Sequence, residues 1–149
     1  MRKRGEKGFT LIELVLVIAI LGILAVSALP NIFNISLTTA RSNSRDAVVG
    51  AVQAGLSLYA ASQISQGNAE SYPANLESSD LADGSAASRT VPMFNQILQG
   101  GVSDQWFKLD DDCYSFDSNG NDAFNDGADV EYQFDSAAGT FLGVADCGT

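Results

Sequence analysis

The sequence predicts an α+β protein, in which a long N-terminal helix packs on a small C-terminal antiparallel β-sheet. Residues 14 to 40 contain no charged side chain, and helical spacing of apolar residues continues from there to Ser65. From Gln105 onward, the pattern shifts to short strands, and Val130, Tyr132 and Phe134 alternate with polar residues as in a strand with one buried face. The chain has 149 residues, which is the usual length of one domain.

The first part of the predicted helix is long enough to cross a membrane. Phe9 to Leu29 is a run of 21 residues, roughly 32 Å as a helix, against a bilayer core of about 30 Å. Four of the eight Lys and Arg residues lie in the first seven positions. A basic segment before an apolar run holds that end of the chain in the cytoplasm, so we expect a single membrane pass.

The second part of the helix is amphipathic. Val48, Val52, Leu56 and Tyr59 follow helical spacing within the range 41–65 and predict a face that packs on the sheet. Pro30 lies between the two parts and predicts a kink or local melting, because proline lacks a backbone donor and clashes with the preceding turn. The whole helix would be roughly 85 Å long. So small a protein cannot cover a helix of this length by itself, and neighbouring copies in a polymer would cover it.

A connection and four strands complete the predicted fold. Residues 66–104 are rich in Gly, Ser, Ala, Asn and Asp, which is typical of a loop, with a short helix or turn over 91–98. The four predicted strands are 106–109, 113–116, 130–134 and 140–144.

Composition excludes several classes of function. The net charge is −10, and acidic residues argue against nucleic-acid binding, which needs Lys and Arg on the phosphates. The chain has no histidine, which removes the commonest general base and metal ligand. Asp110 and Asp112 form no recognisable catalytic set, so we do not expect an enzyme. Cys113 and Cys147 predict one disulfide if this part of the chain is exported.

Three interpretations of the N-terminus can be weighed. Residues 26–28 resemble a signal-peptidase site, but the apolar run is longer than a signal peptide needs and Pro30 lies just beyond the cut. A simple membrane anchor does not explain Glu13, because a carboxylate in hydrocarbon costs about 2.5–3.5 kcal/mol. An acid at this position therefore indicates a functional residue.

The third interpretation comes from a resemblance. The run Gly8-Phe-Thr-Leu-Ile-Glu13, followed by about twenty mostly apolar residues, resembles the N-terminus of type IV prepilins and of the pseudopilins of type II secretion. The resemblance implies a leader over residues 1–8, a transmembrane and filament-core helix over 9–35, and a globular pilin head over 36–149. It implies that prepilin peptidase cleaves between Gly8 and Phe9 and methylates the new N-terminus. It further implies that Glu13 meets the α-amino group of a neighbouring subunit during assembly.

The resemblance also implies partners and a location. The partners would be further copies in a helical homopolymer, prepilin peptidase and an inner-membrane assembly platform, with no cofactor. The precursor would lie in the inner membrane, and the assembled chain in an extracellular pilus or a periplasmic pseudopilus. A disulfide commonly bounds the C-terminal region of type IV pilins, whereas many pseudopilins lack one, so a pilin is the leading interpretation and a major pseudopilin the alternative.

An acidic stretch leaves two interpretations open. Asp117, Asn119 and Asn121 alternate like the start of a calcium loop, and Asp122 and Asp126 add oxygen ligands. Position six of that loop is Asp122 rather than glycine, and Ala128 stands where a bidentate glutamate belongs. A non-helical calcium site and a solvated turn between two strands are both compatible with these residues.

Overall fold

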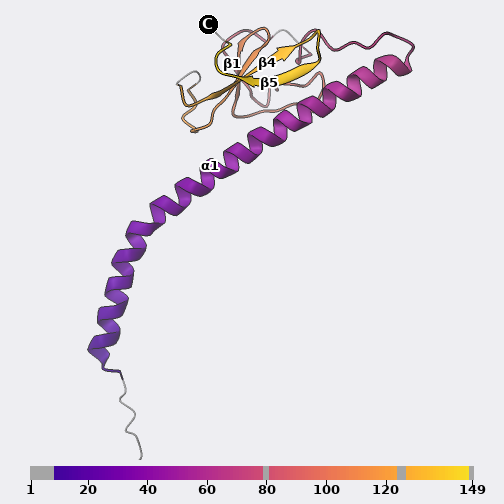
Figure 1. Cartoon of the computed structure of the whole chain (residues 1–149). Helices are drawn as coiled ribbons and strands as arrows, with labels where there is room; N and C mark the ends of the chain where they lie inside the picture. The colour runs from indigo at the N-terminus through magenta and orange to yellow at the C-terminus, as the bar shows by residue number, and fades with distance from the viewer. Residues whose placement is uncertain (1–8, 79–80, 124–126, 148–149) are drawn as a thin grey trace, which may run out of the picture. The chain divides into compact units, whose positions relative to one another are not determined.

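The computed structural model describes residues 9–78, 81–123 and 127–147, and the side chains at 28–36 also lie outside the described part. The chain divides into two units, Met1–Thr39 and Ala40–Thr149. One helix, α1 (Leu11–Ser65), contributes to both (Figure 1). Its assignment is continuous through position 30, and the predicted kink at Pro30 stays a prediction.

In the second unit, five strands form an antiparallel sheet in the order β1-β2-β3-β4-β5. Their bounds are Ser85–Ala86 for β1, Trp106–Asp110 for β2, Cys113–Phe116 for β3, Val130–Asp135 for β4 and Thr140–Val144 for β5. The α+β fold predicted from the sequence is therefore confirmed, and β2 to β5 lie where the four strands were predicted. The two-residue strand β1 falls inside the predicted loop and was missed.

Alternation along the strands decides which face of the sheet is buried. Tyr132 and Phe134 are buried, whereas Gln133 between them is exposed. Phe141 pairs with Phe134 and is fully buried on the same face. Apolar residues on this face remove surface from water, which is the main favourable contribution to folding.

The helix covers that face. Val52 and Leu56 of α1 belong to the same buried cluster as the aromatic residues of the sheet. The Gln53 side chain also donates a hydrogen bond to the Phe141 carbonyl, at 3.1 Å. In Figure 1 the C-terminal part of α1 accordingly lies alongside the strands. The amphipathic pattern read from the sequence thus packs as predicted.

The connection between α1 and the sheet contributes to the core instead of lying wholly in solvent. Leu76, Leu81, Met93 and Phe94 are buried in the same cluster. Phe94 sits in the predicted turn with φ of 58°, and its ring meets that of Trp106 edge to face at 5.2 Å. The connection approaches α1 closely at Gly55, where an added Cβ would lie 3.0 Å from the carbonyl oxygen of Ile97, tighter than most Cβ contacts.

Candidate functional site

Two residues of the predicted assembly motif, Thr10 and Glu13, cap the N-terminus of α1. The Thr10 backbone N–H and hydroxyl both donate to Oε2 of Glu13, at 2.9 and 2.7 Å. The Glu13 backbone N–H in turn approaches the Thr10 hydroxyl oxygen at 3.4 Å. This reciprocal arrangement is a capping box, which satisfies donors that the first turn of a helix leaves without partners. The spacing Thr10-x-x-Glu13 is its sequence signature, so this cap was predictable from the sequence but was missed.

The helix that follows exposes apolar side chains on all sides. Within this unit every large aliphatic side chain from Leu11 to Val26 is at least 45% exposed. A helix that is apolar all round belongs in lipid or against other helices. Glu13 is the one charged residue of Leu11–Ser27. Its carboxylate therefore lies at the start of an otherwise apolar surface, where a charge is costly in lipid.

The membrane segment must be distinguished from the rest of α1. By length and composition Leu37–Ser65 passes for a membrane span, whereas Leu11–Ser27 forms a shorter apolar stretch. Leu37–Ser65 carries Arg41, Arg45 and Asp46, and it supplies Val52 and Leu56 to the core of the second unit. We therefore assign the membrane segment to the N-terminal stretch, which the structure leaves uncovered over its described length.

Comparison with known families bears on this N-terminus. Residues 3–29 match the family model described as the prokaryotic N-terminal methylation motif. The chain therefore begins with this motif. This motif is the hallmark of type IV pilin and pseudopilin precursors, as the sequence predicted. The matched segment includes Gly8, which lies outside the described residues, and Phe9, which is exposed. Neither the search of curated proteins nor that of solved structures found a match to the chain.

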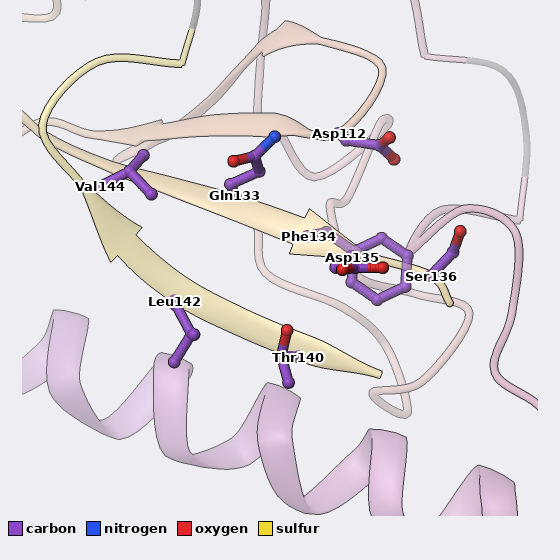
Figure 2. Close-up of a pocket in the computed structure, with 8 residues that line it drawn as sticks. All are labelled: Asp112, Gln133, Phe134, Asp135, Ser136, Thr140, Leu142 and Val144. Atoms are coloured by element: carbon purple, nitrogen blue, oxygen red, sulfur yellow. The ribbon is translucent and has the colours of Figure 1, made fainter. Parts of the chain in front are cut away.

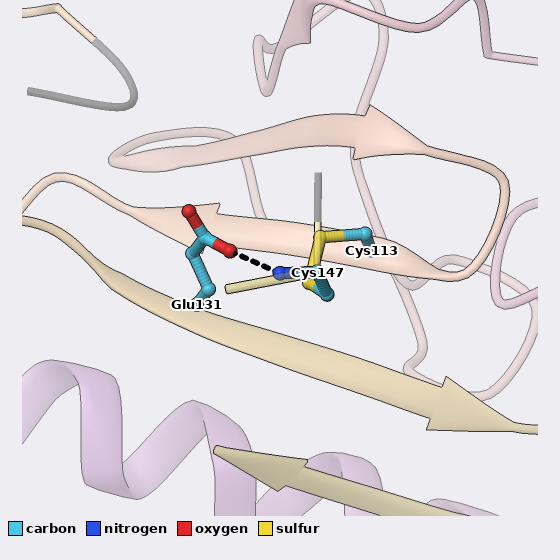
Figure 3. A group of neighbouring side chains, drawn as sticks. All are labelled: Cys113, Glu131 and Cys147. Carbon is cyan, nitrogen blue, oxygen red and sulfur yellow. Dashed lines mark hydrogen bonds between the residues drawn. A yellow bond between two sulfur atoms is a disulfide. The ribbon is translucent and has the colours of Figure 1, made fainter. Parts of the chain in front are cut away.

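At the other end of the chain, the two cysteines tie the C-terminal tail to the sheet. Cys113 of β3 and Cys147 form a disulfide with a Cα–Cα distance of 5.8 Å (Figure 3). Glu131 of β4 accepts a hydrogen bond from the Cys147 backbone N–H, at 2.7 Å. The three side chains lie close enough together to resemble a metal site. The sulfur atoms are bonded to each other, however, so we interpret the cluster as a structural clamp.

The predicted calcium residues lie in the connection between β3 and β4. Asp117 is buried and accepts backbone N–H groups from Gly120 and Asp122 on its two oxygens. The side-chain oxygens of Asn119 and Asn121 accept the N–H groups two residues further on, each at 2.9 Å. Such turns stabilise the loop without an ion.

One feature of this loop is closer to a calcium loop than the sequence indicated. Asp122 has φ of 57°, the left-handed conformation for which glycine is usually required. The fifth predicted ligand, Asp126, lies outside the described residues. The calcium site stays a prediction.

A hollow of about 360 Å³ opens on the sheet at the turns β2–β3 and β4–β5 (Figure 2). We call it the acidic hollow; it is lined by Asp112, Gln133, Phe134, Asp135, Ser136, Thr140, Leu142 and Val144. Burial raises the pKa of Asp112, and the neighbouring carboxylate of Asp111 adds to the rise. Asp112 stands out in the sequence as part of an acidic run, but its proximity to β4 depends on strand pairing, which no local pattern predicts.

A second polar group that the sequence did not reveal lies inside the fold. Glu77 of the connection is 5% exposed, and its Oε2 accepts a hydrogen bond from the Tyr114 hydroxyl at 3.0 Å. Lys108 is 3% exposed and donates to the Leu81 carbonyl at 3.2 Å. Burial raises the pKa of Glu77, while the Tyr114 hydrogen bond and the charge of Lys108 oppose that rise. A buried carboxylate of this kind makes stability depend on pH.

Proposed function

We propose that the chain is a pilin, the structural subunit of an extracellular type IV pilus-like filament. The observation that carries the proposal is the methylation motif at residues 3–29, at the start of an apolar helix whose side chains are exposed. A lipid bilayer or the α1 helices of other copies would cover that surface. Adhesion would be a property of the assembled fimbria.

The proposed sequence of events follows the N-terminus. The precursor lies in the inner membrane with its basic end in the cytoplasm. Prepilin peptidase cleaves after Gly8 and methylates the amino group of Phe9. An assembly platform then moves the subunit into the filament, where Glu13 meets the α-amino group of a neighbour. An ion pair offsets part of the cost of a buried carboxylate, so this contact fixes register more than it adds stability.

The disulfide favours a pilin over a pseudopilin. The Cys113–Cys147 bond closes the C-terminal region, as is common in the pilins that the sequence resembles. The second candidate is a major pseudopilin of type II secretion, and the loop at Asp117 supports it. In that case Asp117, Asn119, Asn121, Asp122 and Asp126 would bind calcium and order the loop between β3 and β4.

Two measurements test the proposal. Mass spectrometry of the mature protein should find a chain that begins at methylated Phe9. A start at Leu29 would instead indicate signal-peptidase cleavage and contradict the prepilin interpretation. Deleting the gene should remove filaments from sheared cell-surface material. Loss of secreted proteins with surface filaments unchanged would favour the pseudopilin.

A further inference from the structure

Positive charge is scarce in the part of the chain that follows Gly8. It retains 4 basic against 17 acidic side chains, a net charge of −13. Three of the four cations are engaged within their own chain. Arg41 donates to the Asn119 carbonyl at 2.7 Å, Arg45 pairs with Asp46 at 2.8 Å, and Lys108 is buried against the Leu81 carbonyl at 3.2 Å.

The fourth cation, Arg89, is exposed and makes no hydrogen bond or ion pair with the described residues. It lies in a tight turn whose ends bind each other. The Ser88 backbone N–H donates to the Val91 carbonyl at 3.0 Å, and the Val91 N–H donates to the Ser88 carbonyl at 3.2 Å. The backbone of Arg89 is therefore fixed, which lowers the entropy lost when its side chain binds a partner.

The acidic hollow presents negative charge that lacks a cationic partner within the described part of the chain. The Asp112 carboxylate makes no hydrogen bond or ion pair with any residue that the structure describes. Asp135 also lines the hollow, and its Oδ1 accepts the backbone N–H groups of Ala137 and Ala138 at 2.9 and 3.0 Å. Leu142 and Val144 give the hollow an apolar side (Figure 2). A guanidinium group suits such a site, since it binds carboxylates in a plane and packs on apolar surface.

Arg89 and the hollow lie at diagonal corners of the sheet. The strand β1 is one edge and β5, which lines the hollow, is the other. The chain leaves β1 beside the start of β2, where the Ala87 N–H donates to the Trp106 carbonyl at 2.7 Å. Asp112 and Asp135 lie at the opposite end of the strands, beside the turns β2–β3 and β4–β5. Surfaces at opposite corners join copies head to tail, and repeated head-to-tail contacts build an open helical filament.

We propose that Arg89 of one copy docks in the acidic hollow of the next copy, and that this is a contact between heads in the filament. The inference rests on the proposed function and names a partner surface within it. Copies of such an acidic head repel one another. Contact between Arg89, the one cation that is uncommitted among the described residues, and an acidic surface reduces that repulsion and selects one orientation.

The test uses the full chain in cells that process and assemble it. Arg89→Glu and Asp112→Lys should each lower the yield of sheared filaments at least tenfold. The double variant Arg89→Glu with Asp112→Lys should restore most of the yield, because it exchanges the two charges. Asp83→Lys is the matched control, since it makes the same charge change at an exposed residue outside the hollow, and its yield should equal that of the wild type.

A second measurement locates the contact. Arg89→Lys keeps the charge and supplies an amine, so treating these filaments with a zero-length carbodiimide should link position 89 to Asp112 or Asp135 of another copy. Wild-type yield from both single variants would overturn the inference, and so would equal loss in Asp83→Lys. Loss in Asp112→Lys alone would also overturn it and indicate a different ligand, such as a divalent cation. Absence of filaments from the wild-type chain would contradict the proposed function itself.

Discussion

At the residue scale, the Glu13 carboxylate has two separable roles. It accepts hydrogen bonds from Thr10 in its own chain, and in the proposed filament it neutralises a neighbour's α-amino group. Only the second role needs a charge, because a neutral amide oxygen can also accept from a backbone N–H. A capping interaction contributes about 1 kcal/mol, so its loss alone should be tolerated in a long helix.

We predict that Glu13→Gln keeps the cap and loses assembly. The variant should insert, and mass spectrometry should still find cleavage between Gly8 and Phe9. Filament yield should fall at least tenfold, and Glu13→Val should behave in the same way. Thr10→Val removes the hydroxyl but keeps the carboxylate, and it should assemble nearly as well as the wild type. Normal filament yield from Glu13→Gln would show that the charge has no role in assembly.

Glu77 provides a pH-dependent test of the core. Burial raises the pKa of Glu77 in the folded protein above its value in the unfolded chain, so the folded state binds the proton more tightly. The contribution of Glu77 to the free energy of unfolding is therefore greatest below the unfolded pKa, and it is lost as pH rises through the folded pKa.

Glu77→Gln should remove this part of the pH dependence. The glutamine can still accept the Tyr114 hydrogen bond while carrying no charge. The melting temperature of a fragment covering residues 36–149 should change less between pH 4 and pH 8 in the variant than in the wild type. Equal pH profiles would mean that Glu77 stays charged throughout and that Lys108 compensates its burial.

At the element scale, the C-terminal tail depends on one covalent bond. The Cys113–Cys147 disulfide closes a loop with a sequence separation of 34 and encloses β4 and β5. A loop of this length is expected to contribute roughly 3–4 kcal/mol to stability if the bond is unstrained. Hydrogen bonding of Glu131 to the Cys147 backbone holds the tail in place independently.

Cys147→Ser should therefore destabilise the fragment by roughly 3–4 kcal/mol without changing its fold. Denaturant unfolding under non-reducing conditions measures the change. Wild-type protein in excess reductant provides the control, since it should lose the same amount. Peptide mapping of purified filaments should find Cys113 joined to Cys147, and two free thiols there would remove the main argument for a pilin.

The elements differ in how far the sequence could predict them. Strands β3 and β5 were predicted at their exact bounds, because a short run rich in aromatic and β-branched residues is a local pattern and turn residues end it. Strand β1 has no pattern of its own. Its Ser-Ala pair becomes a strand because the edge of β2 offers partners, as when the Gly84 N–H donates to the Lys108 carbonyl at 2.7 Å.

The candidate functional residues divide in the same way into those that a local sequence pattern reveals and those that depend on tertiary packing. Glu13 was singled out because an acid in an apolar run is locally anomalous, and its role in assembly stays a prediction. The contact between Glu77 and Tyr114 joins residues 37 positions apart and depends on tertiary packing, which no local pattern encodes. The acidic hollow depends on the pairing of strands in the same way. The Thr10–Glu13 cap, in contrast, was readable from its spacing.

At the scale of the whole molecule, negative charge is concentrated on one stretch. Seven carboxylates lie between Asp110 and Asp129, and no Lys or Arg lies among them. Self-repulsion of this kind destabilises a compact fold. A bound divalent cation would relieve it specifically, whereas dissolved salt would relieve it by screening.

If the loop binds calcium, as in the pseudopilin alternative, millimolar calcium should raise the melting temperature of the fragment 36–149, because a ligand that binds the folded state alone stabilises it. Magnesium should have a much smaller effect, since it requires a tighter octahedron of ligands. Asp122→Gly should abolish the calcium effect: glycine accepts the left-handed backbone at this position, so the variant removes the carboxylate and keeps the turn. Asp110→Asn removes the same charge outside the proposed ligand set, and it should respond to calcium like the wild type. Equal effects of calcium, magnesium and monovalent salt at matched ionic strength would contradict the site and identify the loop as a screened acidic turn held by Asp117.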